Sequence, residues 1–476
     1  MNILIRCFFL PAVLFCTGLL QAESIDIEPG PRSSVGLVIY NQNLALVNEA
    51  YTLDLPAGQS ELNFSAVSPL INFHSAVLHP LPKTLTVREQ YFRAAMTPEE
   101  VLSSSVGQMV SLLSTNPVSG EQTRERARVL SVSGGIILEI DDHYETSLAG
   151  RRIVYDALPS GVLSPTLSVG VESTVNAQAE LVLSYLSGGL SWNADYVAQL
   201  NSEHDVLQLR AMATISNDSG VNFQAAQLEL IAGSVNQVQN NVAMRREMSL
   251  SVMAAAPEAA PSIQPVSLAD LYLYTVPGKV DLSDNSIRQI KLFDARDVPV
   301  QQLYLLAGQA NVYYSPNVPE QKLKVDSVIE FSNESDHHLG QAMPAGVVRV
   351  YVRAKAQPGK LHFIGEDRIG HTSEKGKVRL NIGKAFDLGG VRKQLVYRRL
   401  PVEAPFRQHS ETQVQMVLSN AKPKAVTVQI QENFSGQWSL VDGPTPVDSD
   451  ARSARWNLLV PAQGEATLNF TVRVKR

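Results

Sequence analysis

Two histidines, His362 and His371, are the clearest candidates for chemistry in the sequence. They end the segment His-Phe-Ile-Gly-Glu-Asp-Arg-Ile-Gly-His, and a two-residue turn at Glu366-Asp367 would make it a β-hairpin with the two histidines opposed. Opposed side chains on one face of a hairpin have Cβ atoms about 5 Å apart, so two imidazoles could meet one metal ion. Against this, Glu-Asp is a poor two-residue turn, and two histidines supply half of a tetrahedral zinc site. We keep His362 and His371 as metal-ligand candidates, beside the alternative that they are structural or exposed.

Two other short motifs match the residue patterns of catalytic sites but lack the neighbouring motifs and secondary structure that those sites need. Ser419-Asn-Ala-Lys422 fits S-x-x-K and Ser283-Asp284-Asn285 fits S-D-N, but their order is the reverse of that in penicillin-binding enzymes, and no K-T-G is found. The proline after Lys422 favours a turn where the motif needs a helix start. The sequence contains no G-x-S-x-G elbow, no phosphate-binding glycine loop and no H-E-x-x-H. We therefore predict no catalytic or cofactor-binding residue and no cofactor, although a triad assembled from distant residues stays open.

The charge balance argues against a nucleic-acid partner. The chain has 40 Lys and Arg against 46 Asp and Glu, a net charge of −6, and no basic block. Its 476 residues exceed one ordinary domain, and its 44% apolar content is enough to build cores. We expect a folded, multi-domain protein that does not bind nucleic acid.

Both cysteines, Cys7 and Cys16, lie in a segment with the layout of an export signal. A basic residue precedes an apolar run over residues 7–20, which is too short to span a bilayer, and a small-residue cleavage pattern ends at Ala22. Removing a signal peptide of residues 1–22 would leave no cysteine for disulfides or thiolate sites. No later window has 18 apolar residues, so we expect no transmembrane span after cleavage. A lipoprotein, disfavoured by the phenylalanine before Cys16, and an uncleaved anchor are the alternatives.

Alternation of apolar and polar residues dominates after residue 22 and predicts an all-β protein of antiparallel sandwiches. One short helix is expected after Thr97-Pro98-Glu99-Glu100, which combines an N-cap, a proline at the first helical position and a capping-box glutamate. Three tryptophans fall in strand-like contexts that favour core anchors: Trp192, Trp438 and Trp456. The clearest strand-like runs are 35–40, 84–88, 135–140, 179–186, 206–215, 323–331, 346–353, 412–418, 425–431 and 465–474.

The changes in pattern along the chain predict four β units after the signal. Four or five short strands within about sixty residues favour a small SH3-like barrel, with an extra sheet of a neighbouring sandwich as the alternative. A segment dense in alanine and proline predicts a flexible loop. The predicted division is a signal peptide 1–22, an N-terminal β module 33–92, an SH3-like small β barrel 97–157, a central β-sandwich 165–390 with a flexible Ala/Pro-rich loop 240–267, and a C-terminal immunoglobulin-like β-sandwich 391–476.

Several ordered phrases resemble the bacterial domain-of-unknown-function 4139 proteins. They are the segments 36–47, 185–197, 363–372 and 432–438, followed by 454–456 and 460–462. Some relatives carry a mucoidy-inhibitor label and have a coiled coil after the first β module, where this chain has the barrel-like 97–157. That difference weakens transfer of the label. The resemblance implies an exported all-β protein and supplies no site residue.

The sequence thus favours an exported protein, periplasmic or at the cell surface, that acts by binding or as an envelope scaffold rather than as an enzyme. An envelope protein or a glycan is the expected kind of partner. The rival is a metal-dependent hydrolase whose site is assembled from distant histidines and carboxylates. A third reading is a small-ligand or glycan-binding module, which would need an aromatic-lined groove. Oligomeric state does not follow from the sequence.

Overall fold

The computed structural model describes residues 23–28, 32–65, 67–157, 164–236, 265–268, 271–308, 310–353 and 360–476. The described strands form five sheets, so the predicted all-β fold of several sandwiches is confirmed. No described helix has the length and apolar character needed to cross a membrane. The predicted signal peptide 1–22 and nearly all of the predicted loop 240–267 lie outside the described residues.

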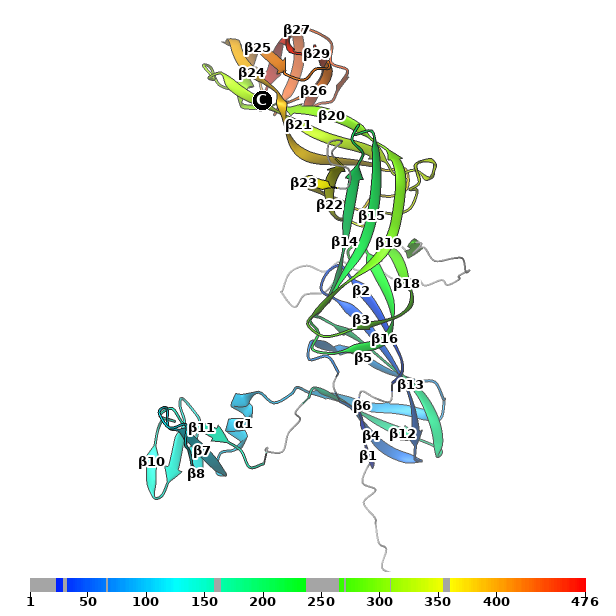
Figure 1. The fold of residues 1–476 in the computed structure, drawn as a ribbon, viewed down its shortest axis with the longest axis vertical. Helices are drawn as coiled ribbons and strands as arrows, with labels where there is room; N and C mark the ends of the chain where they lie inside the picture. Colours follow the sequence, from blue (N-terminus) through cyan, green and yellow to red (C-terminus); the bar gives the residue numbers. More distant parts are fainter. Residues whose placement is uncertain are drawn as a thin grey trace, which may run out of the picture.

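Sheets A and B, at the bottom of Figure 1, join N-terminal and central segments. Sheet A has the order β1 (Glu23–Ile27), β4 (Gly58–Ser65), β12 (Thr166–Ser173) and β6 (Leu85–Arg93). Sheet B has the order β17 (Pro265–Leu268), β18 (Leu271–Leu282), β16 (Phe223–Ala232), β2 (Arg32–Tyr40), β3 (Ala45–Leu55), β13 (Ala177–Ser187) and β5 (Ile71–Pro80). The predicted modules 33–92 and 165–390 are therefore not separate, because β12 and β13 complete the sheets that the N-terminal strands begin.

Sheet D lies above sheet B along the long axis of the molecule (Figure 1). Its order is β19 (Ser286–Pro299), β15 (Val206–Asn217), β14 (Leu190–Leu200), β22 (Gly346–Arg353) and β23 (Leu361–Ile369). Its inner side chains belong to one hydrophobic core that extends from sheets A and B to Phe331 and Leu380 in sheet E. Trp192 is fully buried there, and its indole Nε1 donates to the Ile231 carbonyl at 3.0 Å, as expected of a core anchor.

Sheet E, at the top of Figure 1, has nine strands and includes the C-terminus. Its order is β27 (Gln437–Asp442), β30 (Gly464–Lys475), β25 (His409–Asn420), β24 (Lys377–Arg399), β21 (Gln321–Ser332), β20 (Gln301–Ala307), β26 (Val426–Asn433), β29 (Ser453–Val460) and β28 (Asp448–Ser449). The two arms of the sheet face each other across a second core, in which Trp456 stacks on Phe470 with ring centroids 4.9 Å apart. Trp438, half-buried, stacks on Phe434. The 3₁₀ turns η1 (Ala310–Tyr313) and η2 (Ser335–His337) complete the upper half.

The predicted boundary between residues 390 and 391 falls inside a continuous strand. β24 has 23 residues, and it pairs with β21 on one side and β25 on the other. The second core also contains Leu306, Tyr313 and Val325, which precede the predicted C-terminal domain. The upper sandwich therefore takes strands from the predicted central domain, since one long strand serves both cores.

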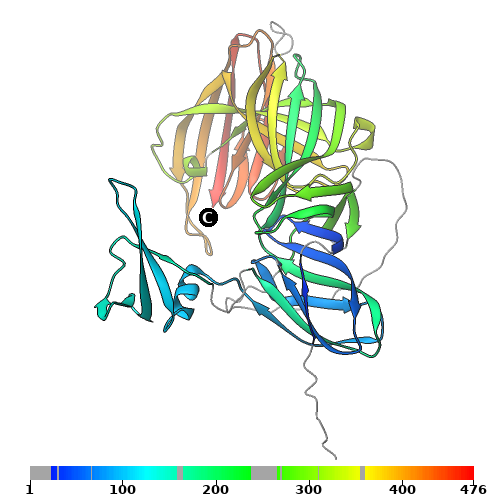
Figure 2. The ribbon, with the colours of Figure 1, turned by 60° about the horizontal axis from the view of Figure 1, so that its bottom comes forward.

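The segment 97–157 forms a separate unit that stands to one side of the body in both ribbon views (Figures 1 and 2). It consists of α1 (Pro98–Ser104) and sheet C, with the order β10 (His143–Glu145), β9 (Ile137–Ile140), β8 (Gln122–Ser131), β7 (Met109–Thr115) and β11 (Arg152–Val154). The predicted capping box is confirmed: Thr97 and Glu100 each accept the backbone N–H of the other. The prediction of four or five short strands is confirmed, but the described pairings form an open sheet rather than a closed barrel. The strands that would have to meet, β10 and β11, have only three residues each.

Candidate functional site: the outer face of sheet D

The outer face of sheet D collects polar side chains because its strands alternate strictly. In β14 the inward residues Trp192, Ala194, Tyr196 and Ala198 are at most 1% exposed, and the residues between them point outward. The same alternation in the neighbouring strands produces a broad polar surface, which we call the D face. The D face consists of Asp195, Val197, Gln199, Gln208, Arg210, Met212, Thr214, Gln289, Lys291, Asp294, Arg296, Val347, Arg349, Tyr351, Arg353, Phe363, Glu366 and Arg368.

Strand register places amides and aromatic rings in one row across the D face. Gln199 lies opposite Gln208 on β15 and beside Tyr351 on β22, and Tyr351 lies opposite Phe363 on β23. The two rings meet edge to face with centroids 5.6 Å apart, and Phe363 is 56% exposed. A row that leads from a large exposed ring through a second ring to two amides is a surface to which an amphipathic ligand can bind.

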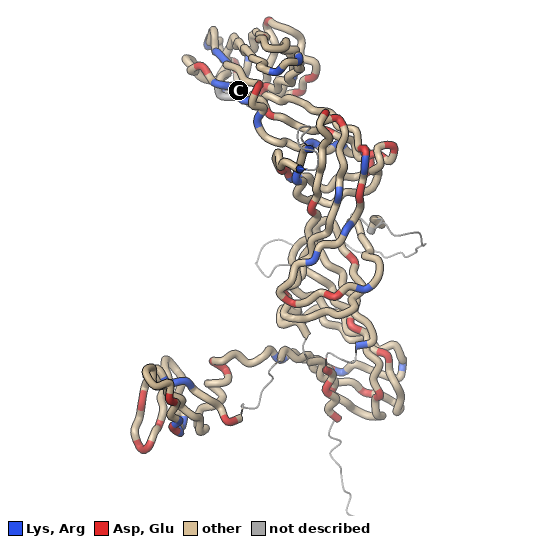
Figure 3. The backbone as a smooth tube through the Cα atoms, viewed as in Figure 1, with Lys and Arg blue, Asp and Glu red and all other residues tan. Residues whose placement is uncertain are grey.

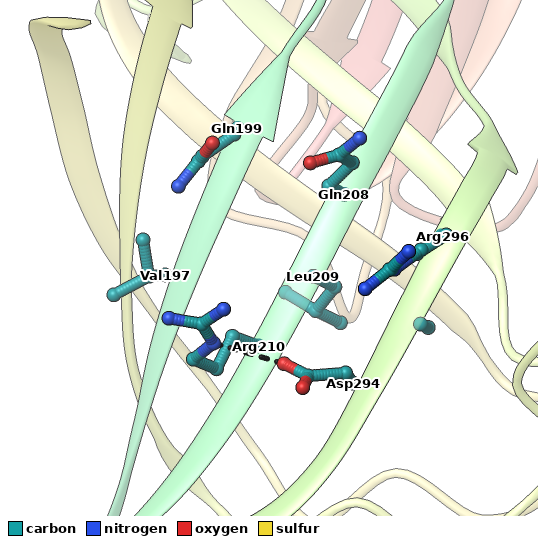
Figure 4. A pocket seen from close by; sticks show the side chains of 8 residues that line it. Val197, Gln199, Gln208, Leu209, Arg210, Asp294 and Arg296 are labelled. Carbon is teal, nitrogen blue, oxygen red and sulfur yellow. Dashed lines mark hydrogen bonds and ion pairs between the residues drawn. The ribbon is translucent and has the colours of Figure 1, made fainter.

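A hollow of about 290 Å³ opens at one end of this row (Figure 4). Its origin is a bulge in β19, where two residues, Arg296 and Asp297, stand between the pairs Leu207–Val298 and Leu209–Ala295. Asp297 takes the left-handed value φ 55° that lets the strand absorb the extra residue. The hollow is lined by Val197, Gln199, Gln208, Leu209, Arg210, Asp294, Ala295 and Arg296.

Ion pairs organise most of the charged groups of the D face. Asp294 Oδ1 lies 2.9 Å from Arg210 Nε, and its Oδ2 lies 3.6 Å from Lys291 Nζ. Arg349 Nη1 lies 2.8 Å from Asp195 Oδ1, and its Nε lies 3.4 Å from Glu366 Oε2. The hydrogen bond that Arg349 donates to Asp195 raises the pKa of Arg349 above its usual value. The face therefore offers fixed donors and acceptors, among them the Thr214 hydroxyl, which donates to Asp195 Oδ2 at 2.6 Å.

The hairpin predicted at Glu366-Asp367 is wrong. β23 runs without a turn from residue 361 to 369 and pairs along its length with β22, so that His362 lies opposite Val352. His371 lies beyond the other end of the strand, where its Nδ1 accepts the Ala345 N–H at 3.2 Å. A strand of nine residues extends about 30 Å, so the two imidazoles do not meet. Within the described ranges no three His, Cys, Asp or Glu side chains are grouped as a metal site requires.

The S-x-x-K match has a structural explanation. Ser419 is near the end of β25, and its hydroxyl lies 3.4 Å from the Gly389 carbonyl in the paired strand. Lys422, in the turn that follows, pairs with Asp387 at 3.6 Å and lies over the Tyr304 ring. The segment is a turn, as the following proline predicts, and its lysine does not contact Ser419 in any described interaction.

Two clusters of ionisable side chains are buried in the two cores. In the lower cluster, Glu49 Oε1 lies 3.0 Å from Arg32 Nη1, and the Tyr51 hydroxyl donates to Glu49 Oε2 at 3.0 Å. Glu49 is fully buried, and burial raises its pKa, against the opposing effects of Arg32 and Tyr51. The hydroxyl of buried Tyr185 has no hydrogen-bond partner in the described part of the chain. These groups are closed to substrate, which favours a structural role.

The upper cluster consists of Tyr313, Arg392 and Glu432. The Tyr313 hydroxyl donates to Glu432 Oε2 at 2.5 Å and accepts from Arg392 Nη2 at 3.0 Å, while Arg392 also pairs with Glu432. The guanidinium carbon lies 5.4 Å from the centroid of the Tyr313 ring. Burial raises the pKa of Glu432, and Arg392 opposes the rise. The two arginine side chains differ in exposure, at 9% for Arg32 and 1% for Arg392.

Sequence reasoning missed both the D face and the buried clusters. The D face depends on which strands become neighbours, which the alternation within one strand does not reveal. The lower cluster did leave a signal, because Glu49 occupies an inward position between Val47 and Tyr51 in an otherwise alternating strand. No protein-family model matches this chain, and no curated protein matches it.

Proposed function

We propose that this protein is an exported, envelope-associated binding protein, periplasmic or at the cell surface, that holds a polysaccharide on the D face without altering it. The observation that carries the proposal is the row Phe363, Tyr351, Gln199 and Gln208, which ends in the hollow beside the β19 bulge. Export is supported by the signal-like segment 1–22 and by the resemblance of several phrases to an exported family.

The chemistry of the row suits a sugar chain. A sugar ring has apolar C–H faces that pack on exposed aromatic rings, here Phe363 and Tyr351, and hydroxyl groups that bond in pairs to amides and guanidinium groups. Gln199 and Gln208 supply both donors and acceptors, and Arg353 Nη2 donates to Gln199 Oε1 at 3.3 Å. Five strands spaced at about 4.8 Å make a flat face about 20 Å wide, which fits an extended polymer.

The same face argues for binding rather than hydrolysis. Glycoside hydrolysis needs two carboxyl groups on either side of the scissile bond, one acting as an acid and the other as a base or nucleophile. Each carboxylate of the D face, Asp195, Asp294 and Glu366, already forms an ion pair with an arginine. The D face is therefore better equipped to orient a chain than to cleave one.

The test is affinity electrophoresis of the purified full-length mature chain in native gels that contain dextran, xylan or polygalacturonate. We expect at least one polysaccharide to retard the protein, and the double variant Gln199→Ala/Gln208→Ala and the variant Phe363→Ala to lose that retardation. Gln224→Ala, an exposed glutamine on β16 in sheet B, is the matched control and keeps it. If no polysaccharide retards the wild type, or if the double variant is retarded equally, the proposal is wrong.

A further inference from the structure

We infer that the D face selects an anionic polysaccharide, one whose sugars carry carboxylate or phosphate groups. This inference rests on the proposed function and adds the chemical class of the ligand. It starts from the charges of the D face. The face carries the six cations Arg210, Lys291, Arg296, Arg349, Arg353 and Arg368, and the three carboxylates Asp195, Asp294 and Glu366.

This excess of positive charge is local. The whole chain has a net charge of −6, and over most of the molecule basic and acidic residues are interspersed (Figure 3). A net positive face on an acidic protein is a complementary surface for a polyanion. A neutral polysaccharide would gain nothing from this arrangement.

Some cations of the D face form no ion pair with a described carboxylate and can therefore bind an anionic ligand. Asp294 serves both Arg210 and Lys291, while Arg349 lies between Asp195 and Glu366. No described carboxylate pairs with Arg296 or with Arg368, so their positive charge is not neutralised within the described chain. Arg353 on β22 likewise has no described carboxylate partner, and it donates to the Gln199 amide oxygen. The surplus charge thus lies at three positions, of which Arg296 and Arg368 are at opposite edges of the sheet.

Arg296 is also the cation that the fold directs into the hollow. The bulge in β19 gives one residue of β15 two partners, and Arg296 lines the hollow together with Gln199, Gln208 and Arg210. Figure 4 shows its guanidinium on β19 beside Leu209 and Gln208 of the neighbouring strand. A guanidinium group binds carboxylate or phosphate through two parallel hydrogen bonds, and the adjacent amides can bind sugar hydroxyls. The hollow thus has one anion subsite flanked by polar groups.

The experiment compares charged polymers with uncharged ones, and polygalacturonate and its methyl ester share a backbone and differ only in charge. The probes are polygalacturonate, its uncharged methyl ester, a phosphorylated mannan, the same mannan without phosphate and single-stranded oligothymidylate, tested with the full mature chain by titration calorimetry at low and at physiological ionic strength. We expect polygalacturonate, phosphomannan or both to bind at least about tenfold more tightly than the methyl ester, and added salt to weaken that binding. A preference for polygalacturonate over its methyl ester identifies carboxylate as the anion, and a preference for phosphomannan over the same mannan without phosphate identifies phosphate.

The variants test whether the two cations at the sheet edges, Arg296 and Arg368, produce the selectivity. Arg296→Gln/Arg368→Gln should weaken binding of the anionic polymer about tenfold and leave the methyl ester unaffected. The control Lys279→Gln/Arg399→Gln removes the same charge from exposed positions on β18 and β24 and should leave all affinities unchanged.

The outcomes separate this inference from the proposed function. Equal binding of polygalacturonate and its methyl ester overturns the anionic preference and leaves polysaccharide binding standing. Absence of binding to every polysaccharide overturns both. Tighter binding of oligothymidylate than of either anionic polysaccharide also overturns the inference, because the rings and cations would then serve a nucleic acid.

Discussion

The lower and upper buried clusters use the same three residue types in different settings. The lower cluster, Arg32, Glu49 and Tyr51, comes from the single hairpin of β2 and β3, in which Arg32 and Tyr51 are paired neighbours. The upper cluster draws Tyr313, Arg392 and Glu432 from η1, β24 and β26, which are far apart in the chain. The lower arginine keeps contact with solvent, and the upper one does not.

This difference shows that the cost of breaking a buried ion pair depends on whether the remaining charge can reach water. A charge that loses its partner costs little if it can turn toward water and several kcal/mol if it cannot. The upper cluster is closed to solvent, but its charges have additional partners. The Tyr313 hydroxyl bonds to both Glu432 and Arg392, and the Tyr313 ring lies beside the guanidinium group. We therefore expect the two clusters to respond unequally to matched substitutions.

The largest effect is expected from removing the carboxylates. Glu432→Ala leaves the Arg392 guanidinium unpaired inside the core and should lower the free energy of unfolding of the upper sandwich by about 3–5 kcal/mol. Glu49→Ala should cost less, about 1–3 kcal/mol, because Arg32 can reach water. Hydrogen exchange followed by mass spectrometry, over β25 and β30 and over β3 and β13, measures each loss separately. Equal losses would mean that solvent access does not distinguish the clusters.

Removing the phenolic hydroxyls should lower the free energy of unfolding by less, and again by more in the upper cluster than in the lower one. Tyr313→Phe deletes a group that donates to Glu432 and accepts from Arg392, and should cost about 1.5–3 kcal/mol. Tyr51→Phe deletes one bond to Glu49 in a more open cluster and should cost less. Urea unfolding curves of the two variants provide the comparison, and a larger loss for Tyr51→Phe would contradict it.

The stability of the upper cluster should also depend on the close packing of Gly308 against the Glu432 carboxylate. A Cβ atom at Gly308 would overlap the Glu432 carboxylate, so Gly308→Ala should destabilise the upper sandwich by about 1–3 kcal/mol. At Gly36, near the lower cluster in sequence, the nearest atom to an added Cβ is Asn48 Cβ at 3.8 Å, so Gly36→Ala serves as the control. Exchange protection of β26 should fall in the first variant only.

The smallest effect should appear in the pH dependence. Burial raises the pKa of Glu49 and Glu432 in the folded protein, and the paired arginines limit the rise. An acid with a raised folded pKa contributes stability that is complete below its unfolded pKa, about 4.3, and is lost as pH rises through the folded pKa. Relative to Glu49→Gln and Glu432→Gln, the wild type should therefore be most stable below about pH 4.3. Urea midpoints measured over a pH series test this, and an advantage that increases with pH would have the wrong sign.

Local patterns in the sequence predicted many of the secondary-structure elements. Alternation predicted strands in ten runs, and the run 346–353 coincides with β22. Thr97 and Glu100 fixed the start of the one α-helix among the described residues, and Trp192 and Trp456 marked the cores. These features depend on a few neighbouring residues, whose spacing already specifies which side chains point inward.

Strand pairing and domain boundaries followed from contacts between segments far apart in the chain. The segment from His362 became one strand instead of a hairpin because β22 offered a partner along its whole length. β24 joined two predicted domains, and the β19 bulge directed Arg296 into the hollow of the D face. Register and partner choice depend on hydrogen bonds and cores contributed by residues far apart in the chain, so no local pattern contains them.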